Sequence, residues 1–170
     1  MEILINKRYE VFLDGQLSYV ISSKFFSLLP KLTISDSSSK EVRIILKGVL
    51  TFFTTAFDIY RDNEVFNLRL KKAWKTQYNC QVGNDLYEIY AHRGRKYSVF
   101  KNEIQIAWWD SDLVVVFGNK YKIIADKDSD FELLIAFCIS LEGGGGGSTM
   151  DLGNVGGQGK IFDPYWQPKY

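Results

Sequence analysis

Short apolar runs with a period of two residues follow one another along most of the chain. In a β-strand successive side chains point to opposite faces, so this alternation is typical of strands that bury one face. The polar segments between the runs have the length that hairpin turns need. The pattern predicts about twelve short antiparallel strands, at residues 9–13, 17–22, 31–36, 41–50, 56–60, 64–70, 78–82, 86–91, 97–100, 103–109, 113–117 and 121–125.

Several connections between these runs carry residues that tolerate positive φ in tight turns. They are Asp14-Gly15, Arg61-Asp62-Asn63, Gly83-Asn84, Lys101-Asn102 and Gly118-Asn119. An internal repeat accompanies the hairpins, because four lysines recur at intervals of 23, 25 and 24 residues, each followed by an aliphatic residue ten to twelve positions later. The lysines are Lys24, Lys47, Lys72 and Lys96, and the aliphatic residues are Ile34, Ile59, Val82 and Ile106. Such units cannot cover their own apolar faces, so we expect them to curl into a sheet that closes and removes its edges.

The segment SDFELLIAFCISLE, residues 129–142, is apolar on nearly every side. Ser129 with Glu132 forms a capping-box pattern, so the sequence predicts a helix over about 129–141 with Asp128 or Ser129 as its cap. A helix without a polar face must be enclosed by protein or lipid. Thirteen residues reach only about 20 Å, short of the hydrocarbon core at about 30 Å, and the flanks lack basic and aromatic anchors. We therefore expect a buried core helix and not a membrane span.

Strands and helix together predict the fold class, which is mainly β. A closed barrel of about twelve antiparallel strands leaves a lumen too wide for its own side chains, and the hydrophobic C-terminal helix fills it. The predicted domain covers residues 1–142. Residues 143–159, with nine glycines among seventeen residues, are expected to be a linker. EGGGGGS is also typical of an engineered linker, whereas TMDLGNVGGQGK favours a native glycine-rich tail.

Composition and charge limit the class of protein, its partners and its cellular compartment. The chain is 46% hydrophobic and 24% charged, as in ordinary soluble domains, and its 21 basic and 20 acidic side chains nearly balance. No global field attracts nucleic acid, so no nucleic-acid partner is expected. Cys80 and Cys138 lie in apolar runs and favour buried free thiols, with a single disulfide as the alternative. The first residues lack a secretory pattern, so we expect a mature intracellular N-terminus and a cytoplasmic protein, free or peripheral to a membrane.

A barrel of this kind around a hydrophobic helix resembles the tubby C-terminal-like superfamily, which includes the LURP-one-related proteins and the phospholipid scramblases. The resemblance covers about residues 8–142 and is carried by the segments VISSKFFSLLPKLTISD (20–36), ILKGVLTFFTTAFDIYRDNEV (45–65), LRLKKAWKTQYNCQV (68–82) and NKYKIIADKDSDFELLIAFCISLE (119–142). It implies either phosphoinositide binding through basic side chains or membrane association. The chain has neither a cysteine-rich palmitoylation segment nor an acidic calcium loop, and no lipid-binding residue can be transferred by position.

Two basic clusters are the candidate binding site. They comprise Arg69, Lys71, Lys72 and Lys75 in the first cluster and Arg93, Arg95 and Lys96 in the second. If strand pairing brings the clusters together, they form a site for an anion or a lipid head group. The competing interpretation, which we favour, is a solvated strand face whose lysines oppose aggregation.

Catalytic chemistry has few candidates. His92 is the only histidine, no cysteine pair has zinc spacing, and neither a metal nor another cofactor is expected. Asp110 and Asp112 are read as turn residues between strands, and GNVGGQGKIF (153–162) departs from the phosphate-loop pattern. The leading hypothesis is a non-enzymatic intracellular binding or scaffold module. The alternative is a peripheral membrane protein that binds anionic phospholipid or phosphoinositide, and an enzyme is the weakest hypothesis.

The C-terminal tail, residues 161–170, concentrates aromatic side chains next to two prolines. We expect it to dock on this barrel or on a partner through Phe162, Tyr165, Trp166 and Tyr170, with Tyr165 and Trp166 as anchors. A frayed terminus is the alternative. The expected partner is thus an anionic lipid or a protein.

Overall fold

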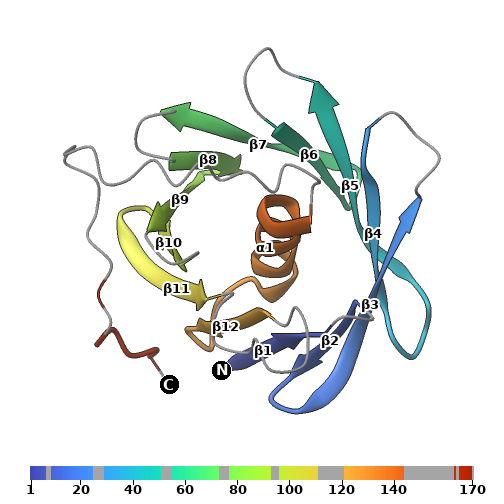
Figure 1. The fold of residues 1–170 in the computed structure, drawn as a ribbon, viewed down its shortest axis with the longest axis horizontal. Coiled ribbons are helices and arrows are strands. Elements are labelled where there is room, and N and C mark those ends of the chain that lie inside the picture. Colours follow the sequence, from blue (N-terminus) through green and yellow to red (C-terminus); the bar gives the residue numbers. More distant parts are fainter. Residues whose placement is uncertain are drawn as a thin grey trace.

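In the part of the chain that the structure describes, twelve strands form a barrel that winds around one helix. The computed structural model describes residues 1–6, 9–24, 29–50, 55–72, 77–92, 96–110, 121–143, 163 and 165–169. The strands are β1 (Glu2–Ile5), β2 (Glu10–Leu13), β3 (Gln16–Lys24), β4 (Lys31–Asp36), β5 (Val42–Leu50), β6 (Thr55–Arg61), β7 (Glu64–Lys72), β8 (Gln77–Val82), β9 (Asp85–His92), β10 (Lys96–Lys101), β11 (Ile104–Asp110) and β12 (Tyr121–Ala125), followed by α1 (Phe131–Gly143). Each strand pairs antiparallel with its neighbours in sequence, and β1 pairs with β12 to close the barrel (Figure 1). The predicted fold class is confirmed.

The closing strand β1 is absent from the predicted strands. Ile3 and Ile5 point into the core, and β1 pairs with β12 from Glu2 opposite Ile124 to Ile5 opposite Tyr121. The predicted run 113–117 lies outside the described residues, whereas the other predicted runs each fall on a strand. β1 has only two buried positions, which are too few to give a periodic pattern in the sequence. The strand is recognised from its hydrogen-bonded ladder with β12.

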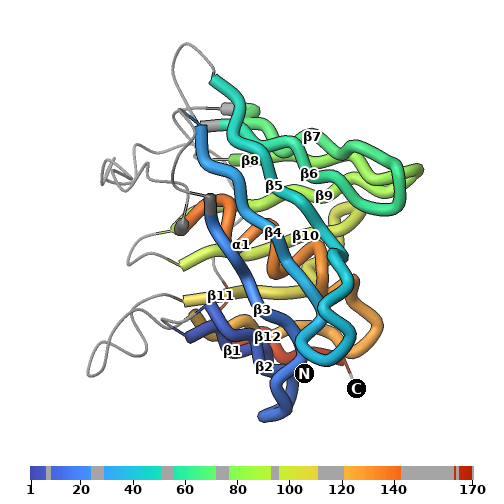
Figure 2. Tube along the Cα trace, turned by 90° about the vertical axis from the view of Figure 1, so that its right-hand side faces the viewer, coloured from blue at the N-terminus to red at the C-terminus, as the bar shows by residue number. Residues whose placement is uncertain are grey.

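The two ends of the barrel differ in their connections. Positive φ angles occur at Asp14-Gly15, Asp62-Asn63, Gly83 and Asn102-Glu103, so four of the predicted turns are confirmed, and Gly118-Asn119 lies outside the described residues. These turns gather at one end, here called the turn end (right-hand side and bottom of Figure 2). Helix α1 enters there after β12 and finishes at the opposite end, here called the helix-exit end.

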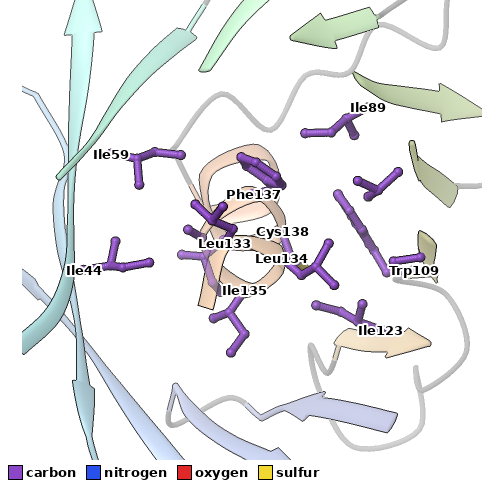
Figure 3. Close-up of a cluster of buried hydrophobic side chains, with 14 of the residues drawn as sticks. Ile44, Ile59, Ile89, Trp109, Ile123, Leu133, Leu134, Ile135, Phe137 and Cys138 are labelled. Atoms are coloured by element: carbon purple, nitrogen blue, oxygen red, sulfur yellow. The ribbon is translucent and has the colours of Figure 1, made fainter. Parts of the chain in front are cut away.

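The helix fills the lumen. Every side chain from Leu133 to Ile139 is fully buried, and Ser140 is 2% exposed. Around the helix lie inward-facing residues from all sides of the wall, among them Ile44, Ile59, Ile89 and Trp109 (Figure 3). Residues of α1 therefore form the centre of the core, as the absence of a polar face predicts. Cys80 and Cys138 are both free and buried, which confirms the predicted thiols.

The start of the helix differs from the prediction. Asp130 is the cap, because its Oδ1 accepts a hydrogen bond from the Leu133 backbone N–H at 3.1 Å. The Ser129 hydroxyl instead faces the carbonyl of Ile106 at 3.5 Å, and the Ser129 N–H donates to Asp126. Glu132 accepts from Arg43 at 2.8 Å, so it does not complete a capping box. Barrel contacts outcompete the local cap, and the helix spans 131–143 where 129–141 was predicted.

Candidate functional site

Strand order brings the two predicted basic clusters to the same end of the barrel. Strands β7, β8, β9 and β10 are consecutive neighbours, and Lys72 near the end of β7 lies opposite Gln77 at the start of β8. Across the next ladder His92, the last residue of β9, lies opposite Lys96, the first residue of β10. The described residues of the two clusters, 69–72 on β7 with His92 and Lys96 on β9 and β10, therefore lie at the same end of the barrel, the helix-exit end. The side chain of Lys72 and residues Lys75, Arg93 and Arg95 lie outside the described part of the structure.

Each predicted cation with a described side chain has a carboxylate partner. Arg69 donates to Asp58 Oδ1 at 2.5 Å and to the carbonyl oxygen of Phe57 at 2.7 Å. Lys71 Nζ lies 4.0 Å from Glu88, and Lys96 Nζ lies 3.5 Å from the buried Asp110. These pairs join neighbouring strands, except Lys71–Glu88, which reaches across β8. The described cations are thus largely compensated, which favours a structural role for Arg69, Lys71 and Lys96.

Glu88 belongs to a buried polar group on the outer face of β8 and β9. Gln77 Nε2 donates to Glu88 Oε1 at 2.7 Å and contacts the Tyr90 hydroxyl at 3.1 Å. Burial, and secondarily the Glu88 carboxylate, raises the pKa of Tyr90, so its phenol stays protonated. Lys71 Nζ, 4.0 Å from Glu88 Oε1, brings a positive charge close to this buried group from β7.

His92 and Ser98 have the spacing of a base and a nucleophile. His92 Nε2 lies 2.7 Å from Ser98 Oγ, and burial lowers the pKa of His92 to about 4. The imidazole is therefore neutral near pH 7. Ser98 is 0% exposed, so a substrate cannot reach its hydroxyl in this conformation. Asp110, the last residue of β11, pairs with Lys96, and Asp112 lies outside the described residues.

A second basic feature was not predicted as a site. Lys24 lies opposite Lys31, and Lys31 lies opposite Lys47, so three lysines cross β3, β4 and β5 in one row. Lys24 and Lys31 belong to consecutive strands, whereas Lys47 is more distant in sequence, and the strand register places the three backbone positions in one row. Lys24 and Lys47 belong to the predicted lysine repeat, which was the available signal.

The tail meets the barrel at the turn end. The Lys169 backbone N–H donates to Asp126 Oδ1 at 2.6 Å, and the Lys127 N–H donates to the Lys169 carbonyl at 3.3 Å. Trp166 is partly buried, but Tyr165 is 85% exposed, so its ring is not anchored on this barrel. Phe162 and Tyr170 lie outside the described residues. Docking through the aromatic side chains stays a prediction.

The described residues contain neither a candidate metal site nor a helix that could span a membrane. Within those ranges no group of three or more His, Cys, Asp or Glu side chains is placed to hold a metal ion. Among the helical residues that are described, none forms a helix of the length and apolarity that crossing a membrane requires.

Barrel, central helix and chain order define a class, the closed twelve-stranded barrels wound around a C-terminal helix. A family model described as LURP-one-related matches residues 2–142, and the chain belongs to that family. The barrel is consistent with the wider tubby-like and scramblase-like superfamily. Comparisons with curated proteins and with solved structures each found no match.

Proposed function

We propose that the chain is a non-enzymatic binding or scaffold module whose ligand docks on the outside of the barrel. The observation that supports this is the filled lumen, because α1 occupies the space in which a closed barrel of this size holds a ligand. Its family is one of barrel domains, and the Ser98 hydroxyl that faces His92 is fully buried. The buried free thiols of Cys80 and Cys138 suit an intracellular, reducing compartment.

Cross-linking tests the scaffold proposal. A cross-linker with mass-spectrometric readout, applied to cells that produce the chain, should link a partner protein to the outer wall. The comparison variant is Lys71→Glu, which reverses an exposed charge next to Glu88. A partner lost in that variant and retained in Lys40→Glu, an exposed charge at the turn end, supports docking near 69–75. The same pattern of cross-links in the wild type and in both variants would contradict docking near residues 69–75.

The second candidate is peripheral binding to anionic phospholipid or phosphoinositide. Its support is that the end of β7 and the β9–β10 strand ends, which carry the described residues of the two basic clusters, lie at the helix-exit end together with exposed aliphatic side chains. Leu50 at the end of β5 is 83% exposed and Leu29 before β4 is 36% exposed. Basic residues beside exposed aliphatic ones are typical of proteins that rest on a bilayer surface.

Liposome co-sedimentation with and without phosphoinositide, repeated at high salt, tests the lipid candidate. We expect salt-sensitive binding, because head-group contacts of surface lysines are screened within about 8–10 Å at physiological salt. Lys72→Glu combined with Arg95→Glu should abolish binding and leave the melting temperature nearly unchanged. Unaltered binding by this variant would assign the clusters to the structural interpretation.

A further inference from the structure

The loop between β12 and α1, residues 126–130, contacts both backbone groups of one residue near the C-terminus. Asp126 Oδ1 accepts a hydrogen bond from the Lys169 N–H at 2.6 Å, and the Lys127 N–H donates to the Lys169 carbonyl at 3.3 Å. Paired contacts to the N–H and the carbonyl of a peptide unit are how a protein surface recognises an extended backbone. The loop therefore has the geometry of a peptide-docking site.

The acceptor in this loop is held in place by the barrel itself. The Asp126 N–H donates to the Ile106 carbonyl on β11 at 2.8 Å, and the Asp126 carbonyl accepts from the Ser129 N–H at 3.1 Å. Its carboxylate is buried, and the hydrogen bond that it accepts comes from a residue 43 positions later in the chain. A hydrogen bond from a backbone N–H to a carboxylate is stronger than one between neutral groups, and a fixed acceptor loses little entropy on docking.

The segment that docks there shows an alternation of burial. Trp166 and Pro168 are partly buried, whereas Tyr165, Gln167 and Lys169 are exposed. A period of two residues is that of an extended segment with one side against a surface. Trp166 and Pro168 therefore lie on the side that faces the molecule, and their neighbours face solvent.

A turn immediately before this segment restricts its conformations. The Trp166 N–H donates to the Asp163 carbonyl at 3.3 Å, and the Tyr165 N–H donates to Asp163 Oδ1 at 2.9 Å. Aspartate at the first position and proline at the second, as in the sequence DPYW, are typical of a type I turn. A restricted segment loses less conformational entropy when it docks.

The segment is tethered to the same barrel. Helix α1 ends at Gly143 at the helix-exit end, whereas the loop 126–130 lies at the turn end. A nine-residue strand such as β5 is about 30 Å long, and the chain between residues 143 and 163 is long enough to reach about twice that distance. The covalent connection thus allows docking on the same molecule, at an effective concentration on the order of 1 mM.

We propose that the loop 126–130 is a docking site for an extended peptide and that the chain's own residues 165–169 occupy it in the free protein. Asp126 and Lys127 bind the backbone of Lys169 whatever its side chain, so the preference of the site comes from Trp166 and Pro168. A protein partner of this site carries an extended segment with a tryptophan and a proline two residues apart, and it binds by displacing the tail.

This docking site is separate from the two basic clusters. The loop 126–130 lies at the turn end, whereas the described residues of the clusters lie at the helix-exit end. Failure of this proposal therefore leaves the proposed function standing, and the reverse also holds.

Fluorescence anisotropy of a labelled peptide, titrated with the full chain, tests the site. The probe is the synthetic peptide FDPYWQPKY, residues 162–170, labelled at its amino end. Trp166→Ala in the chain removes the largest side chain that holds the tethered segment. This variant should bind the peptide at least about tenfold more tightly than the wild type, in which the tail competes at about millimolar effective concentration. Tyr165→Ala is the matched control, because Tyr165 is 85% exposed, and it should bind the peptide as weakly as the wild type.

Two further measurements locate the site. A peptide with alanine in place of the tryptophan should not bind the Trp166→Ala chain, and adding Asp126→Ala to that chain should weaken binding of the original peptide at least about tenfold. Equal binding of the original peptide by the wild type and Trp166→Ala, or no binding by Trp166→Ala, overturns the proposal. A wild-type dimer in analytical ultracentrifugation that Trp166→Ala dissociates would show that the tail of a second copy fills the site, which overturns docking on the same molecule.

Discussion

At Gly48 in β5, the ring of Pro30 occupies the space that a side chain would take. A Cβ atom there would lie 2.6 Å from Pro30 Cδ and 2.7 Å from Cγ, and the Gly48 N–H donates to the Pro30 carbonyl at 2.7 Å. The prolyl ring cannot rotate away, so Gly48→Ala should cost about 1–3 kcal/mol of the free energy of unfolding. Urea denaturation measures this. Leu50→Ala on the same strand, where the side chain is exposed, should change stability little, and equal midpoints for both variants would show that Pro30 can move.

His92 makes stability depend on pH. Its pKa in the folded chain is about 4, lowered by burial from an ordinary value of 6.5. Between these values the unfolded chain binds a proton that the folded chain does not, so stability falls as the pH drops from 6.5 towards 4. Between about pH 7.5 and pH 5, the lowered pKa taken at face value reduces the free energy of unfolding by about 2 kcal/mol. Because water screens the partly exposed ring, the expected loss is about 1 kcal/mol.

The measurement compares urea midpoints of the wild type and His92→Gln at the two pH values. The glutamine keeps a polar group that can face Ser98 but does not titrate. The wild type should lose about 1 kcal/mol more than the variant on acidification. Identical losses would assign the acid sensitivity to other groups.

At the scale of elements, one carboxylate fixes the start of α1. Asp130 Oδ1 caps the helix by accepting a hydrogen bond from the Leu133 N–H. Asp130 Oδ2 accepts a hydrogen bond at 2.6 Å from Arg61, the last residue of β6. Asp130→Asn should keep the cap and lose the ion pair, at a cost of about 0.5–1 kcal/mol. Asp130→Ala loses both and should cost about 1–3 kcal/mol in total. Thermal or urea unfolding of the two variants separates the contribution of the cap from that of the ion pair. An equal loss of stability in both variants would show that the cap contributes nothing.

The lysine repeat shows how far sequence periodicity reaches at this scale. Its first three lysine and aliphatic pairs fall on the hairpins β3–β4, β5–β6 and β7–β8, whereas Lys96 and Ile106 fall on β10 and β11. The fourth pair is thus shifted by one strand relative to the first three, because β9 lies between β8 and β10. A repeat in sequence predicts recurring hairpins, but it does not fix which strands a hairpin joins, because pairing depends on the ladder and not on spacing alone.

At the scale of the whole molecule, the barrel depends on its apolar centre. Leu134 is fully buried inside the lumen, so Leu134→Asp places an unpaired carboxylate where neither water nor a cation is available. The penalty of several kcal/mol is comparable with the roughly 5–15 kcal/mol that stabilises a domain, and we expect the variant not to fold. Leu50→Asp makes the same chemical change on an exposed side chain and should fold normally. Circular dichroism and a melting curve distinguish the two, and cooperative melting of Leu134→Asp would contradict the enclosed-helix arrangement.

The candidate sites depended on information that the sequence did not carry. Segments 69–75 and 92–96 were visible as dense basic stretches, but the partners that compensate Arg69, Lys71 and Lys96 come from β6, β9 and β11. Lys31 and Lys47 formed no dense stretch and meet only through the β4–β5 ladder. Charge density along a chain is local, whereas compensation of charge is a property of the folded surface.

By itself the sequence determined the mainly β barrel, most of its strands and turns, the buried helix and the free thiols. These follow from alternation, turn chemistry and an all-apolar segment, each of which is a local signal. Only the tertiary structure decided that β1 closes the barrel, that Asp130 caps the helix and which carboxylates compensate Arg69, Lys71 and Lys96. Register, long-range capping and ion pairing join residues far apart in the chain, so their free energies exist only once the barrel has closed.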